Sequence, residues 1–126
     1  MDGNGRWAAQ RGLPRVMGHN EGVKRVREII RAAGESGVKY LTLYTFSEEN
    51  WKRPEAEVKF LMGLLENRLK EELNELKRNG IQLRAIGTLE TLPQASRAVI
   101  EQAMRETSGN TNLTVILALS YSGRRE

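Results

Sequence analysis

Three helical segments alternate with three short extended runs along this chain. Apolar residues recur at helical spacing over residues 19–36, 55–79 and 93–109, whereas β-branched, aliphatic and aromatic residues cluster over residues 40–46, 81–86 and 113–119. Gly37 and Gly80 follow the first two helical segments, where helix ends commonly turn left-handed. This alternation predicts an α/β fold, in which a parallel sheet is covered by flanking helices.

The totals are those of one globular domain. The chain has 126 residues with no internal repeat or low-complexity segment, so we expect a single domain over residues 1–126. Its net charge of +4 suits an anionic ligand or membrane surface but is mild for a nucleic-acid binder. The absence of cysteine excludes disulfides and thiolate chemistry. The longest purely apolar run, residues 115–119, is too short to cross a bilayer. We expect a cytoplasmic protein that contacts the inner face of the membrane.

The first seven residues, MDGNGRW, combine groups that suit a diphosphate and its metal ion. Two glycines let backbone N–H groups approach an anion, and the guanidinium of Arg6 can bind phosphate oxygens. The carboxylate of Asp2 is a ligand that Mg²⁺ prefers. Asp-Gly and Asn-Gly pairs are also ordinary turn sequences, so a plain turn is the alternative. Between Arg11 and Gly18, with Gly12 and Pro14 as breakers, we expect a loop.

Polar residues follow each extended run. Ser47, Asn50 and Arg53 come after the first run, Gly87 after the second, and residues 120–124 after the third. Ligands of open parallel sheets bind beyond the carboxyl ends of the strands, so these segments are expected at one shared edge. The alternative for Ser47 and Asn50 is a turn that caps the long helix over residues 55–79.

Four motifs in order give a specific resemblance: DGNGRWA from Asp2, the GHxxG segment at residues 18–22, FSxENWxRP at residues 46–54, and NTxLT at residues 110–114. Together they resemble the cis-prenyltransferases, including bacterial enzymes that make undecaprenyl diphosphate. The resemblance covers essentially the whole chain. It implies a Rossmann-like, three-layer α/β domain of which residues 1–126 are the N-terminal portion, with a first strand and a C-terminal part lying outside them.

The activity implied by the resemblance is prenyl transfer. Isopentenyl diphosphate is added in successive cis condensations to an allylic diphosphate, farnesyl diphosphate, giving the undecaprenyl diphosphate used as a lipid carrier for the bacterial cell wall. Mg²⁺ is the implied cofactor, with Asp2 as its ligand and a catalytic residue. A homodimer and no nucleic-acid partner are also implied.

The family motifs also imply roles for individual residues. Asn50 would accept a proton, alone or in a relay with Ser47, although an amide is a poor base and would more readily orient a phosphate oxygen or a water. The substrate-binding residues implied by the resemblance are Gly3, Asn4, Gly5, Arg6, Trp7, Arg15, His19, Ser47, Glu48, Glu49, Trp51 and Arg53.

Some positions depart from the family pattern. Glu48 replaces a second serine and adds negative charge beside the expected diphosphate, and Ile116, Ser120 and Ser122 replace two asparagines and a glycine of the closing strand. For Trp7 and Trp51, packing is the alternative to substrate contact. The leucines of the long helix could line a tunnel for the prenyl chain, with packing against the sheet as the alternative.

Two other classes of function stay open from the sequence. One is a non-catalytic subunit, or an inactive fragment, of a prenyltransferase assembly. The other is a basic nucleic-acid-binding domain, motivated only by charge and by the cluster at Lys24, Arg25 and Arg27.

Overall fold

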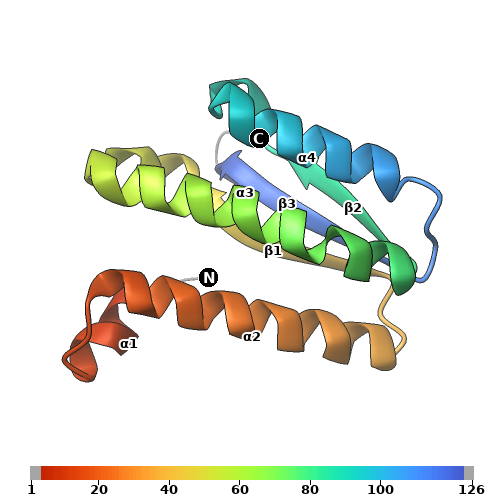
Figure 1. Ribbon diagram of the computed structural model, residues 1–126, viewed down its shortest axis with the longest axis horizontal. Coiled ribbons are helices and arrows are strands. Elements are labelled where there is room, and N and C mark those ends of the chain that lie inside the picture. Colours follow the sequence, from red (N-terminus) through yellow and green to blue (C-terminus); the bar gives the residue numbers. More distant parts are fainter. Residues whose placement is uncertain (1–3, 124–126) are drawn as a thin grey trace.

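The computed structural model describes residues 4–123, except for the side chains of residues 4, 5, 15 and 16. Helices and strands alternate along it as predicted (Figure 1). In chain order the elements are α1 (Asn4–Gln10), α2 (Arg15–Glu35), β1 (Tyr40–Ser47), the 3₁₀ helix η1 (Glu48–Lys52), α3 (Glu55–Arg78), β2 (Ile81–Ile86), the 3₁₀ helix η2 (Leu89–Thr91), α4 (Gln94–Glu106) and β3 (Leu113–Tyr121).

The N-terminal segment corrects the sequence prediction. Residues from Asn4 onward form helix α1 rather than a turn, and α2 begins at Arg15 rather than after Gly18. Pro14, in an extended conformation, precedes the first turn of α2, where a missing N–H costs nothing. Gly18 is buried within α2, and an interior glycine costs a helix only about 1 kcal/mol, which packing against α1 can offset.

The three strands form one parallel sheet in the order β1-β3-β2. Strand β3 is central, with Leu43 of β1 opposite Leu117 and Leu83 of β2 opposite Val115. These side chains are buried and form the core together with apolar residues of α3 and α4. Parallel strands need long crossovers, and α3 and α4 supply them here.

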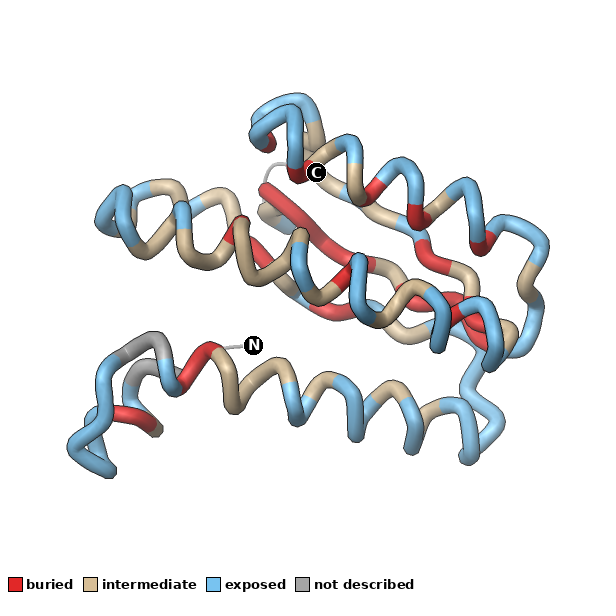
Figure 2. Tube along the Cα trace, in the orientation of Figure 1, coloured by how far each residue is buried: buried red, intermediate tan, exposed pale blue. Residues whose placement is uncertain are grey.

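Within residues 4–123, helices α2, α3 and α4 all lie on the same face of the sheet (Figure 1). Buried residues run along the strands and along the helix turns beside them (Figure 2). Tyr40, Tyr44 and Ile86 are exposed and alternate with the inward-facing residues of β1 and β2, so they lie on the opposite face. The part of the chain that the structure describes therefore contributes two layers of the three-layer arrangement that we expected.

A β-bulge near the end of β1 redirects the side chains of the last residues of this strand. The pairing with β3 shifts between Tyr44 and Phe46, so Phe46 lies opposite Leu119 and turns its ring into the core. Bulges locally bend a strand and redirect the side chains that follow. Ser47 and the 3₁₀ helix after it start from this redirected end.

Gly87 follows β2 with a φ of +110°, a backbone conformation that residues with a Cβ atom rarely adopt. A Cβ atom at this position would overlap the carbonyl oxygen of Leu119 in β3. Only glycine therefore lets β2 leave the sheet so close to the central strand.

We predict that Gly87→Ala lowers the free energy of unfolding by at least about 2 kcal/mol, because it adds both a clash and backbone strain. Gly63→Ala is the matched control, since an added Cβ in this α3 position meets nothing within 4 Å. The control should raise stability by up to about 1 kcal/mol. Urea denaturation of the complete gene product measures both, and equal stability of the two variants would contradict the prediction.

Candidate functional site

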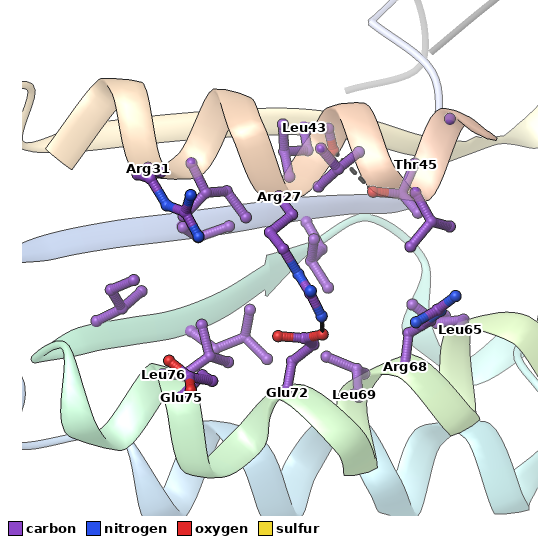
Figure 3. A pocket seen from close by; sticks show the side chains of 18 of the residues that line it. Arg27, Arg31, Leu43, Thr45, Leu65, Arg68, Leu69, Glu72, Glu75 and Leu76 are labelled. Carbon is purple, nitrogen blue, oxygen red and sulfur yellow. Dashed lines mark hydrogen bonds and ion pairs between the residues drawn. The ribbon is translucent and has the colours of Figure 1, made fainter. Parts of the chain in front are cut away.

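A cavity of about 1040 Å³ lies between α2, α3 and the buried face of the sheet (Figure 3). Its walls are largely apolar, with Val26 and Ile30 on α2 and a row of leucines on α3. At the carboxyl end of the strands it is lined by the predicted site residues His19, Asn50 and Arg53. At the opposite end it is lined by polar residues that precede the strands, namely Lys39, Asn79 and Asn112.

A shared carboxylate links two of the predicted ligand residues. Oε1 of Glu57 accepts a hydrogen bond from Nη1 of Arg53 at 2.8 Å and lies 3.2 Å from Nε2 of His19. His19 and Glu57 are mostly buried, with side chains 8% and 13% exposed. Glu57 lies in the first turn of α3, where the helix dipole favours a negative charge. The carboxylate therefore holds an imidazole and a guanidinium together at the polar end of the cavity.

Ser47 and Asn50 form a cap, but on the short 3₁₀ helix η1 rather than on the long helix α3 that the alternative named, because Pro54 occupies the N-cap position of α3. The backbone N–H of Ser47 donates to Oδ1 of Asn50 at 2.9 Å, closing a capping box on η1. With its oxygen engaged in this way, the Asn50 amide has its N–H₂ group to present to a ligand at the cavity.

Trp51 is anchored from two sides. Its Nε1–H donates to Oγ of Ser120 at 2.9 Å, and its ring meets the ring of Phe46 edge-on at 4.8 Å. Oγ of Ser120 is also within hydrogen-bond distance, 2.8 Å, of Oγ1 of Thr91. Ser120 is buried and has a φ of +48°, so it fixes the position where β3 ends. The serine that departs from the family pattern thus makes its own hydrogen bonds, and Trp51 has the packing role that we kept as an alternative.

The acidic residues after β1 lie near Tyr44. Desolvation, and then the charge of the nearby Glu49 carboxylate, raise the pKa of the Tyr44 phenol, and the charge of Glu48 raises it further. The Tyr44 hydroxyl donates to the carbonyl of Tyr121 at 2.7 Å. Both carboxylates therefore act on the phenol at the exposed edge of β1.

The opening motif is only partly described. Arg6 and Trp7 lie on α1, which packs against α2, and the Trp7 ring is stacked 4.4 Å from the guanidinium carbon of Arg11. Asp2 and Gly3 lie outside the described residues. The backbones of Asn4 and Gly5 start α1, and that of Arg15 starts α2, but their side chains are not described.

The structure thus brings His19, Asn50 and Arg53 together at one cavity, with Ser47 bonded to Asn50. Sequence reasoning missed Glu57, because Arg53 lies before α3 in an extended conformation and the pair is therefore not a helical i,i+4 pair. It also missed Thr91, whose contact with Ser120 no local pattern predicts.

Neither a metal cluster nor a membrane span is found in the described part of the chain. No three histidine, cysteine, aspartate or glutamate side chains of residues 4–123 gather as a metal site. Over the same residues, no helix combines the length and apolar character needed to cross a bilayer.

The fold and the cavity define a class of protein: an α/β domain with an apolar binding cavity that carries hydrogen-bond donors at its strand-end mouth. Comparison with known proteins narrows this class. A family model described as "Putative undecaprenyl diphosphate synthase" matches residues 1–126. The chain belongs to this prenyltransferase family, which confirms the resemblance found in the sequence.

Individual relatives agree with the family model. The chain is 54% identical over 126 residues to an isoprenyl transferase of Agrobacterium fabrum and 52% identical to one of Clostridium perfringens, covering 100% of this chain and 51% and 50% of theirs. The chain thus spans about half the length of these relatives.

Solved structures show the same fold. Lavandulyl diphosphate synthase from Lavandula x intermedia, in complex with dimethylallyl diphosphate, matches 99% of this chain and 54% of its own, with a TM-score of 0.93 and 35% identity. A probable undecaprenyl diphosphate synthase from Campylobacter jejuni matches 85% of this chain and 51% of its own, with a TM-score of 0.78 and 37% identity.

We predict that Glu57→Ala destabilises the complete gene product by about 1–3 kcal/mol, because it removes the acceptor that pairs with both Arg53 and the buried His19. Glu55→Ala is the matched control on the same turn, since the Glu55 side chain is 84% exposed and pairs only with exposed Lys59 in the described contacts. That control should cost less than about 0.5 kcal/mol. Equal losses in urea denaturation would refute the special role of Glu57.

We also predict that Ser120→Ala costs about 1–2 kcal/mol, because the Trp51 indole N–H loses its acceptor in a part-buried place. Ser122→Ala, two residues further on and less buried, should change stability by less than about 0.5 kcal/mol. Chemical denaturation monitored by tryptophan fluorescence checks both. If only Ser122→Ala lowered the free energy of unfolding, the hydrogen bond from Trp51 to Ser120 would contribute nothing to stability.

Proposed function

We propose that the complete protein is a cis-prenyltransferase that condenses isopentenyl diphosphate with an allylic diphosphate, starting from farnesyl diphosphate, and forms undecaprenyl diphosphate. The observation that carries this proposal is the shape and chemistry of the cavity. Donor groups line the end that carries His19 and Arg53, and apolar side chains of α2, α3 and the sheet line much of the space beyond them, between charged residues of the two helices. This combination suits an anionic head attached to a hydrocarbon tail.

His19 and Arg53 would bind the head group. The Arg53 guanidinium offers N–H donors at the cavity mouth and is about one-third exposed, so a diphosphate can reach it, and the His19 ring lines the same end of the cavity. Glu57 holds both side chains in place before the ligand binds. Such preorganisation lowers the ordering cost of binding an anion.

In the reaction, the allylic C–O bond breaks and the electron pair leaves with the diphosphate. The terminal double-bond carbon of isopentenyl diphosphate forms a new C–C bond to the allylic carbon, and a proton is then lost from the former isopentenyl group. Donors on the departing diphosphate stabilise the charge that develops there. The engaged oxygen of Asn50 supports a role in orienting a phosphate oxygen or a water, rather than in accepting the proton itself.

We also propose that the protein binds Mg²⁺ through Asp2. The described residues offer no group of three ligands for it, so Asp2 and the diphosphate oxygens would hold the ion. A divalent ion supplies charge stabilisation for the leaving group.

The apolar wall would hold the growing tail. Val23, Val26 and Ile30 of α2 are only partly buried, which leaves their surfaces to contact a hydrocarbon. Met62, Leu69 and Leu76 of α3 are buried in the core and also reach the cavity, so packing and lining coexist on this helix. We further propose that the protein forms a homodimer. We also propose that it contacts the inner face of the membrane, because a polyprenyl product partitions into lipid.

We predict that the complete gene product, given farnesyl diphosphate, labelled isopentenyl diphosphate and Mg²⁺, forms long polyprenyl diphosphates. Asp2→Ala should lower kcat by at least about 100-fold, because the leaving group loses its metal support. His19→Ala should lower kcat/KM by about 10–100-fold. Chromatography of the labelled products measures chain length and rate.

Arg11→Ala is the control, because Arg11 is exposed in the turn after α1, stacks on Trp7 and is not among the residues that line the cavity. It should retain activity within about threefold of the parent, as expected for a surface change. The proposal fails if no labelled polyprenyl product forms. If product forms only with a longer homologous chain present, and Asp2→Ala has no effect, the protein is a non-catalytic subunit instead.

A further inference from the structure

Besides the contact of His19 with Glu57 at the mouth, a second charged contact joins the two helices that form the cavity walls. The guanidinium of Arg27, on α2, reaches the carboxylate of Glu72, on α3, and both side chains line the cavity (Figure 3). Leu65 and Leu69 lie on the side of Glu72 toward the cavity mouth, and Leu76 lies beyond it.

The pair stands near the middle of the cavity's length. Arg27 is eight residues after His19, and Glu35, which lines the far part of the cavity, is eight residues after Arg27. At the rise of an α-helix, each interval is about 12 Å. The pair therefore divides the space beneath α2 into a half with the His19 end and a distal half.

The pair is also easy to open. The Arg27 side chain is 58% exposed, and exposed ion pairs are among the weakest contacts in proteins. The apolar side chains of α2 that pack on the core, Val26, Ile30 and Ala33, are only partly buried, so packing holds the middle of α2 loosely. A hydrocarbon cannot replace either partner of the pair, so a chain that passes this point must displace it.

We propose that the Arg27–Glu72 ion pair is a gate that determines how long a prenyl chain the cavity accepts. A short chain occupies the half that begins at His19 while the pair stays closed. A longer chain enters the distal half only when the pair opens. This inference rests on the proposed function and adds a specificity-determining element to it.

Charge reversal tests the gate in the complete gene product. Arg27→Glu places two carboxylates face to face, so the ratio of longer to shorter polyprenyl products should rise about fivefold, the upper range expected for an exposed pair. The double variant Arg27→Glu/Glu72→Arg re-forms the pair and should restore the parent ratio. An unchanged ratio in Arg27→Glu, or a failure of the double variant to restore it, overturns the proposal.

Arg25→Glu is the matched control. Arg25 lies two residues earlier on α2 and pairs with Glu21 and Glu28 of the same helix, outside the residues that line the cavity. The same charge reversal there should leave product length unchanged. A shift as large as that of Arg27→Glu would mean that any loss of charge on α2 has this effect, which overturns the gate.

A binding measurement separates this inference from the proposed activity. Calorimetry with decyl phosphate and octadecyl phosphate, below their micelle concentrations, compares a short and a long tail on one head group. Arg27→Glu should tighten octadecyl phosphate relative to decyl phosphate by about fivefold, and the double variant should reverse this. If the parent protein makes no polyprenyl product but this selectivity changes, the proposed activity fails and the gate stands. If product forms and neither readout changes, the gate fails alone.

Discussion

The parallel direction of the three strands is the constraint on which the site depends. Because β1, β2 and β3 all run the same way, the segments that follow them end at one edge of the sheet. Ser47, Gly87 and Tyr121 therefore become neighbours of that edge although they are far apart in the sequence. The bulge before Phe46 and the left-handed Ser120 then shape the edge, and Trp51 is held against both.

Helix α2 is joined to α3 by charges at two levels. His19 contacts Glu57 at the mouth of the cavity, and Arg27 contacts Glu72 midway along it. Between these pairs the side chains that line the cavity are mainly apolar, apart from two charged residues of α3, and they enclose the cavity instead of closing on each other. This contact between α2 and α3 responds to a ligand more readily than a packed core would. Each charged group of an ion pair can interact with water or with an anion in place of its partner, whereas buried apolar contacts have no such substitute.

Much of the architecture was predictable because it is periodic. The helical stripe of residues 55–79 and the short runs at residues 81–86 and 113–119 predicted α3, β2 and β3, and Gly37 and Gly80 adopt the positive φ expected of residues that end helices. The family motifs were specific enough to identify the family, and the comparison confirms it. The loop predicted around Gly12 and Pro14 is present over residues 11–14, but the predictions for residues 4–7 and 15–18 were wrong. Both stretches are helical, because α1 and α2 pack against each other.

The site, like the fold, could be predicted only in part from the sequence. The roles implied for Ser47, Asn50 and Arg53 stay predictions, but their placement beside a cavity with His19 agrees with the expected edge of the sheet. Glu57 was overlooked because its pairing with His19 joins residues 38 positions apart, and no local pattern encodes such a contact. The same holds for the link from Trp51 through Ser120 to Thr91, which joins three separate segments.

The sequence by itself determined the order of helices and strands, the family and the identity of the polar residues near the strand ends. These depend on periodicity and on motifs whose members are close in the chain. Only the tertiary structure decided which carboxylate holds His19 and Arg53, where the cavity lies, and that Arg27 meets Glu72 across it. Those features arise when helices far apart in sequence pack on one face of the sheet, and their geometry is set by that packing rather than by any local preference.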